Sequence, residues 1–161
     1  MKPIVVLGMG SRLMMDDGIG VNVVETLARE SPEDEYVDYR VGETDWEYGL
    51  DLIVSAEYLI LVDAAIMGKR PGEFTIFPLR ELSSINSGIS QHHLHFLEVM
   101  QQLDQQKRGI MIGIEPFQID FHWGLSRELN ELFDPLVVRI KDAIEKIKKK
   151  YREDRNLLAK D

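Results

Sequence analysis

The chain has 161 residues, the length of one ordinary domain. Hydrophobic residues make up 44% and charged residues 29%, a balance typical of globular proteins rather than disordered chains. The formal net charge of −9 argues against general binding to nucleic acid. The absence of cysteine excludes disulfides, thiolate metal sites and a cysteine nucleophile. Any metal must therefore be held by carboxylate, imidazole or backbone oxygen groups.

The sequence gives no indication of insertion into a membrane. No apolar run reaches the roughly 18–20 residues that span a bilayer. The apolar run Ile4–Leu7 is shorter than the roughly 7–15-residue core of a signal peptide, and no small-residue cleavage site follows it. We therefore expect a cytoplasmic protein. The basic stretch from Lys146 to Arg155 is typical of the solvated end of a helix.

Short apolar runs alternate with amphipathic stretches along the chain. In order, we expect a strand at Ile4–Leu7, a helix at Asp17–Arg29, a strand at Tyr36–Arg40, a helix at Trp46–Ser55, strands at Tyr58–Val62 and Glu73–Phe77, a helix at Ser90–Gln105, a strand at Gly109–Gly113 and a helical region from Ser126 to about Lys150. Pro135 either interrupts this last region or begins a new helix after Asp134. The alternation predicts a single domain over residues 1–161 with a three-layer α/β fold. A mostly parallel, twisted, five-stranded sheet would carry helices on both faces.

Four glycines and two aspartates follow the first predicted strand, in Gly8-Met9-Gly10 and Asp16-Asp17-Gly18-Ile19-Gly20. A dinucleotide fingerprint requires a third glycine where Leu13 stands, and the Gly-Lys-Ser/Thr of a P-loop is absent. Aspartates at a helix N-terminus also disfavour a bound phosphate. Either aspartate could cap the following helix. Gly18 and Gly20 indicate a close approach of backbone or ligand.

Asp63 and a histidine cluster also fall where the predicted strands end or a helix begins. Asp63 ends the most apolar strand, where a carboxylate is costly unless it is solvated, hydrogen-bonded or bound to a cation. The alternative is a simple turn residue. His92, His93 and His95 open the predicted third helix, and His92 and His95 would share one face. Because ligands bind at the carboxyl ends of parallel strands, we expect a mixed carboxylate–imidazole site for Zn, Ni, Co or Fe.

Four motifs occur in a specific order over about residues 3–140. They are Val6-Leu7-Gly8-Met9-Gly10 with Asp16-Asp17-Gly18-Ile19-Gly20-Val21, then Leu59-Ile60-Leu61-Val62-Asp63-Ala64, then Ser90-Gln91-His92, and finally Gly113-Ile114-Glu115-Pro116 with Gly124-Leu125-Ser126. In this order and spacing they resemble the hydrogenase maturation endopeptidases. That family processes the C-terminus of the large subunit of nickel–iron hydrogenases.

The resemblance implies both a site and a substrate. The family's metal-binding triad of two acids and a histidine corresponds to Asp17, Asp63 and His92. These three residues would be catalytic as well as metal-binding, in an endopeptidase often classed as aspartic-type. The implied partner is a nickel–iron hydrogenase large-subunit precursor that loses a short C-terminal extension after nickel insertion. Nickel would then be a recognition element carried by the substrate, although other divalent cations could occupy the site.

Two other functions remain open from the residues. One is a regulatory module of the same fold that binds a metal or nucleotide without peptidase activity, suggested by the Gly8-Met9-Gly10 turn. The other is a divergent α/β hydrolase that cleaves another peptide or amide without nickel. A peptidase must also hold the tail of its substrate. The candidate apolar contacts for this tail are Trp46, Phe117, Phe121 and Trp123, which are otherwise ordinary core and rim aromatics.

Overall fold

The computed structural model describes residues 2–54, 56–84 and 108–158. Its centre is a five-stranded sheet with the strand order β2-β1-β3-β5-β4. The strands are β1 (Ile4–Met9), β2 (Val37–Glu43), β3 (Tyr58–Ala64), β4 (Phe74–Pro78) and β5 (Gly109–Ile114). Neighbours pair in parallel except β4, which runs antiparallel to β5. The five predicted strands and the mostly parallel sheet are therefore confirmed.

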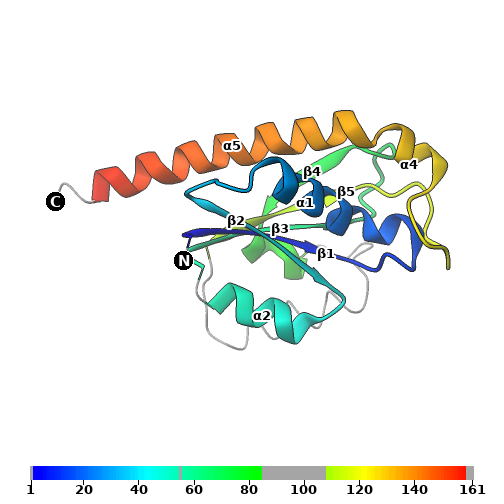
Figure 1. Cartoon of the computed structure of the whole chain (residues 1–161), viewed down its shortest axis with the longest axis horizontal. Coiled ribbons are helices and arrows are strands. Elements are labelled where there is room, and N and C mark those ends of the chain that lie inside the picture. The colour runs from blue at the N-terminus through cyan, green and yellow to red at the C-terminus, as the bar shows by residue number, and fades with distance from the viewer. Residues whose placement is uncertain (1, 55, 85–107, 159–161) are drawn as a thin grey trace.

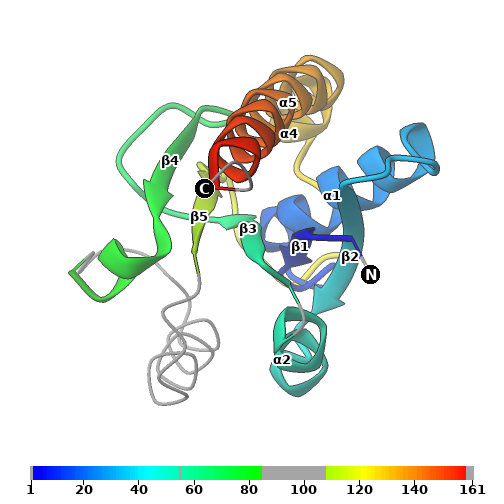
Figure 2. The same ribbon diagram turned by 90° about the vertical axis from the view of Figure 1, so that its left-hand side faces the viewer.

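Helices cover both faces of the sheet, as predicted. They are η1 (Met15–Gly18), α1 (Ile19–Glu30), α2 (Trp46–Val54), η2 (Leu79–Ser84), α4 (Arg127–Glu131) and α5 (Phe133–Leu158), where η denotes a 3-10 helix. Figures 1 and 2 show α1, α4 and α5 on one face and α2 on the other. The helix predicted at residues 90–105 lies outside the described residues. None of the helices in the described ranges is long and apolar enough to cross a membrane.

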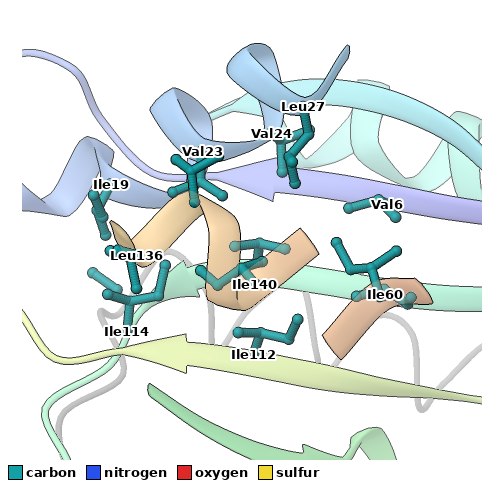
Figure 3. Close-up of a cluster of buried hydrophobic side chains, with 14 of the residues drawn as sticks. Val6, Ile19, Val23, Val24, Leu27, Ile60, Ile112, Ile114, Leu136 and Ile140 are labelled. Carbon is teal, nitrogen blue, oxygen red and sulfur yellow. The ribbon is translucent and has the colours of Figure 1, made fainter. Parts of the chain in front are cut away.

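Two hydrophobic cores lie on the two faces of the sheet, because successive strand residues point to opposite sides. The core between the sheet and helices α1 and α5 includes Val6, Ile60, Ile112, Ile114, Val23, Leu27, Leu136 and Ile140 (Figure 3). The core on the other face includes Val5, Leu7, Leu59, Leu61 and Met111, with Leu50 of α2 packed against it. Burial on both faces explains why β1 and β3 are almost continuously apolar.

The strand order creates a topological switch point between β1 and β3. The chain leaves β1 through α1 to reach β2 on one side, then passes through α2 to reach β3 on the other side of β1. In open α/β sheets, ligands bind outside the carboxyl ends of the strands at such a point. We call this side of the sheet the carboxyl edge.

Two helix boundaries differ from the predicted ones in instructive ways. Helix α1 begins at Ile19 rather than Asp17, because Met15 takes a left-handed conformation (φ +54°) and opens a separate 3-10 turn. Near the C-terminus, a new helix does begin close to Pro135, which lies in the first turn of α5, where its missing N–H costs no helical hydrogen bond. Ser126 caps α4 as expected, its hydroxyl accepting the N–H of Leu129 at 3.2 Å.

Candidate active site

Gly10 is the point at which two of the predicted site residues meet. It follows β1 with a φ of +121°, a conformation that favours glycine. A Cβ at this position would lie 1.9 Å from the backbone oxygen of Asp17 and 3.5 Å from Oδ1 of Asp63. The fold therefore brings Asp17 of η1 and Asp63 of β3 next to Gly10 at the carboxyl edge.

Asp17 is half-buried and serves the β1–α1 turn rather than the helix. Its Oδ2 accepts the backbone N–H of Ser11 at 2.8 Å. The N-cap residue of α1 is Gly18, and no side chain caps this helix. The prediction that Asp16 or Asp17 caps α1 is therefore wrong. The partial exposure of Asp17 leaves its carboxylate within reach of a ligand.

Asp63 is fully buried near the end of β3. The strand continues through Ala64, and Asp63 pairs in register with Gly113 of β5. Its Oδ1 accepts the N–H of Ala64 at 2.7 Å. Asp63 is thus part of the strand and not the turn residue of the alternative interpretation, and its carboxylate is held at the switch point.

The glycines of the first motif allow α1 to lie directly on the strand ends. A Cβ on Gly20 would be 2.2 Å from the carbonyl oxygen of Val62 and 2.8 Å from that of Met9. A Cβ on Gly8 would be 2.9 Å from the Cβ of Val24. The close approach of backbone predicted at Gly18 and Gly20 is confirmed, since a Cβ on Gly18 would also be 3.0 Å from the Cα of Arg12, whereas the contact at Gly8 was not predicted.

Asp16 has a role that the sequence did not reveal. It is fully buried, and its carboxylate accepts four hydrogen bonds from the chain between β5 and α4. The donors are the N–H groups of Phe117 (3.0 Å), Gln118 (2.9 Å) and Ser126 (2.7 Å) and the hydroxyl of Ser126 (2.7 Å). The only sequence signal for this contact was the adjacency of two acids, which did not distinguish their roles.

The third predicted ligand, His92, lies outside the described residues, as do His93 and His95. Within residues 2–54, 56–84 and 108–158, no group of three or more His, Asp or Glu side chains could hold a metal ion. Of the three predicted donors, the structure describes Asp17 and Asp63, and Gly10 lies against the backbone oxygen of Asp17 and Oδ1 of Asp63. Oxygen donors of this kind suit a divalent cation, with further ligands needed to complete its coordination.

Comparison with known proteins decides which family this geometry belongs to. The family model described as hydrogenase maturation protease matches residues 21–153. The chain belongs to this family. The hydrogenase 2 maturation protease of Escherichia coli strain K12 is 28% identical over 147 residues, covering 88% of this chain and 90% of the relative. A putative hydrogenase maturation protease of Methanocaldococcus jannaschii is 29% identical over 157 residues, covering 91% of each chain.

Solved structures agree with this assignment. The hydrogenase-maturating endopeptidase HybD of E. coli superposes with a TM-score of 0.74 at 26% identity, covering 91% of this chain and 93% of that one. The [NiFe] hydrogenase maturation protease HybD of Thermococcus kodakarensis shares the fold, with a TM-score of 0.69 at 22% identity and coverage of 89% and 99%. Membership makes this chain a hydrolase of the endopeptidase class. It disfavours the alternative of a binding module without peptidase activity.

A fourth carboxylate, that of Glu115, lies at the carboxyl edge of this maturation protease, besides those of Asp16, Asp17 and Asp63. It follows β5, is 6% exposed, and its Oε2 accepts the N–H of Met67 at 2.8 Å. Its backbone also bonds to Gly72 and Glu73, in the connection that leads to β4. Glu115 therefore holds the β3–β4 connection against the end of β5. Sequence reasoning noted it only as part of a family motif.

Arg12 fixes the turn that carries the first acids. Its guanidinium donates to both carboxylate oxygens of Glu25 in α1, at 3.0 and 3.2 Å, and its Nε donates to Glu43 at 3.2 Å. The hydrogen bond from Arg12 lowers the pKa of Glu25, and the same bond raises the pKa of Arg12. Such bidentate pairing specifies geometry as well as charge, so it ties the turn to both α1 and the end of β2.

Large apolar side chains are exposed on residues 117–123, which we call the aromatic loop. Phe117 is 49% exposed, Phe121 79% and Trp123 68%. Ile119 at 44% and Leu13 of the neighbouring turn at 51% extend this surface. Three of the four predicted aromatic contacts are therefore exposed side chains of one loop rather than core residues. The side chain of the fourth, Trp46, lies outside what the structure describes.

Proposed function

We propose that this protease removes a C-terminal extension from a nickel–iron hydrogenase large-subunit precursor after nickel has been inserted. The observation that carries the proposal is the juxtaposition of Asp17 and Asp63 beside Gly10, at the switch point of the sheet. Family membership supports the reaction class. The names of the relatives, which refer to hydrogenase 2 and to [NiFe] hydrogenase, support the substrate class.

In this proposal, nickel reaches the site as part of the substrate. Asp17 and Asp63 supply carboxylate oxygens and His92 supplies an imidazole, a donor set that suits nickel and other divalent cations. The nickel ion would dock the precursor so that the scissile bond lies near the two carboxylates.

The proposed chemistry needs one proton acceptor and one attacking water. Asp17, the half-buried member of the pair, accepts a proton from the water as its oxygen attacks the scissile carbonyl carbon. Asp17 then gives this proton to the scissile nitrogen as the C–N bond breaks. The large subunit keeps the new carboxyl group, and the amine of the released extension takes up the proton that this group loses. This would make the enzyme an aspartic-type peptidase whose cleavage depends on the metal that the substrate carries.

The aromatic loop supplies a surface for the precursor in this scheme. Its exposed Phe117, Phe121 and Trp123 belong to the segment bonded to Asp16, the immediate neighbour of Asp17. An apolar stretch of the precursor's tail could therefore rest on the loop while its scissile bond lies at the carboxylates. An open strand edge, β2 or β4, could accept the extended tail as an added strand.

Intact-mass spectrometry of a large-subunit precursor tests the proposal. The precursor is incubated with the protease with and without nickel loaded into it. We expect the loss of one C-terminal peptide from the nickel-loaded sample alone. Cleavage that ignores nickel would contradict the metal-dependent mechanism and favour a general peptidase or amidase. No cleavage of nickel-loaded precursors from several hydrogenases would contradict the proposed function.

A further inference from the structure

The turn before α1 and the aromatic loop are paired along their backbones, although about a hundred residues separate them in sequence. The pairing comprises Met15 N to His122 O (3.0 Å), His122 N to Leu13 O (3.0 Å), Asp16 N to Gln118 O (3.2 Å) and Gly124 N to Arg12 O (3.3 Å). Met15 keeps its left-handed conformation within this pairing. Such conformations persist in non-glycine residues when the surroundings fix them.

The buried Asp16 carboxylate adds side-chain hydrogen bonds to this backbone pairing. Its Oδ2 accepts the N–H groups of Phe117 and Gln118 and the hydroxyl of Ser126, while its Oδ1 accepts the N–H of Ser126. One buried side chain thus holds the start of the aromatic loop and Ser126, which lies three residues beyond the end of the loop. All four partners are donors, which matches a carboxylate, since it accepts at both oxygens.

The result is an exposed apolar loop that is held in one shape. Loops that must be ordered on binding lose affinity, because the ordering entropy opposes association. Here the ordering is built into the free protein, and the residue that provides it is adjacent in sequence to Asp17. A loop tethered in this way presents its aromatic side chains at a fixed position relative to the candidate catalytic carboxylates.

We propose that Asp16 is a positioning residue for precursor binding, acting through the aromatic loop. The inference rests on the proposed function and assigns different roles to the adjacent residues Asp16 and Asp17. Asp17 is half-buried and would face the substrate, whereas Asp16 is fully buried, and among the described residues its carboxylate is hydrogen-bonded to Phe117, Gln118 and Ser126. Loss of Asp16 should therefore raise the KM for the precursor, while loss of Asp17 should lower kcat.

Asp16→Asn tests this with little change in shape. An amide oxygen can keep the three donors of Oδ2, but the new NH2 group then faces the N–H of Ser126. We expect the KM for cleavage of the nickel-loaded precursor to rise at least tenfold, with kcat changed less than threefold. Asp142→Asn, an exposed residue on α5, is the control for the same change of charge.

A pair of substitutions at Ser126 covers the case in which Asp16→Asn does not fold. Ser126→Ala removes the hydroxyl donor to Asp16 and leaves the three backbone donors, so we expect a KM rise of about threefold. Ser126→Thr keeps the hydroxyl and is expected to recover most of that loss. A KM that is the same in Ala and Thr variants would contradict the proposal.

Limited proteolysis by chymotrypsin reports on the loop without the substrate. Chymotrypsin cuts after aromatic residues, and the loop exposes three of them. We expect nicking within residues 117–123 to be at least fivefold faster in Asp16→Asn than in the wild type or Asp142→Asn. A folded Asp16→Asn with unchanged KM, or with a loss confined to kcat, would overturn the proposal. If the wild type cleaves no precursor, the proposed function fails, whereas the nicking rates still decide whether Asp16 holds the loop.

Discussion

Carboxylates that are buried or partly buried lie at both ends of the strands, and the two ends differ in the groups that pair with these carboxylates. We call the end opposite the carboxyl edge the amino edge. At the amino end of β2, Asp34 accepts the N–H groups of Tyr36 and Val37, both at 2.9 Å, and pairs with Lys148 of α5 at 2.8 Å. Only 9% of the Asp34 side chain is exposed. A cation from the protein itself neutralises this carboxylate, and the pair joins α5 to the sheet.

At the carboxyl edge, Asp16 and Asp17 are not paired with a Lys or Arg side chain of the described residues. Asp16 is bonded to N–H and O–H donors, and Asp17 to the N–H of Ser11. Within the described residues, neither forms an ion pair with Lys or Arg, and Arg12 of the same turn is bound to Glu25 and Glu43 instead. The comparison indicates that the carboxylate at the amino edge, Asp34, stabilises the fold through its pair with Lys148. In the proposed function, the carboxyl edge keeps its negative charge for the nickel ion that arrives with the substrate.

Asp17→Asn should give the largest effect and tests the catalytic side of this contrast. Removing a general base lowers rates by roughly 10²–10⁴-fold, so we expect a fall of that size in kcat for precursor cleavage. The rate is measured by intact mass, and the melting temperature serves as the control for folding. A kcat within threefold of the wild type would contradict the assigned role.

Asp34→Ala tests whether the carboxylate at the amino edge stabilises the fold. Removing one partner of a largely buried pair leaves two backbone N–H groups without their acceptor and leaves Lys148 with Glu145 alone, which costs about 2–3 kcal/mol. We expect urea unfolding to show this loss with an unchanged m-value. The kcat per folded molecule should stay close to that of the wild type. A large loss of kcat would mean that the two edges are coupled.

The contribution of Asp34 to stability should depend on pH, which gives a second test of its role. Burial of Asp34 raises its pKa, but the hydrogen bonds from Lys148, Tyr36 and Val37 outweigh burial and leave the pKa below the usual 3.8. A carboxyl group with a lowered folded pKa stabilises fully above its unfolded pKa and loses this contribution as pH falls through the folded pKa. The difference in unfolding free energy between wild type and Asp34→Asn should therefore be constant above about pH 5 and shrink below about pH 4. A difference that persists unchanged to pH 2 would rule out this titration.

Tyr39→Phe should have the smallest effect and the opposite sign. The Tyr39 hydroxyl is buried with no hydrogen-bond partner among the described residues, and burial raises its pKa above the usual 10. Removing an unsatisfied buried hydroxyl should stabilise the protein by about 0.5–1 kcal/mol. The measurement is the urea midpoint, and a loss of stability would indicate an undetected partner for the hydroxyl.

The sheet could be predicted from the sequence because its signal is local. The apolar runs at Ile4–Leu7 and Tyr58–Val62 fixed β1 and β3, and the alternation with amphipathic stretches indicated the parallel, three-layer fold. The convergence of Asp17 and Asp63 followed from the rule that parallel strands place their carboxyl ends at one edge.

The role of Asp16 and the start of α1 could not be predicted, because both depend on distant contacts. The carboxylate of Asp16 is satisfied by Phe117, Gln118 and Ser126, and nothing near Asp16 in sequence indicates those partners. The 3-10 turn that delays α1 contains Met15, whose N–H is bonded to His122. The assignment of His92 as third ligand lies outside the described residues and stays a prediction.

Crystallography of the wild-type protease soaked with Ni²⁺, with anomalous scattering recorded at the nickel absorption edge, tests the central claim most directly. We predict one strong anomalous peak at the carboxyl edge. The nickel ion at this peak should be coordinated by carboxylate oxygens of Asp17 and Asp63 and by the imidazole of His92. A peak on other histidines or on the amino edge, with none beside Gly10, would contradict the claim that this edge receives the nickel of the precursor.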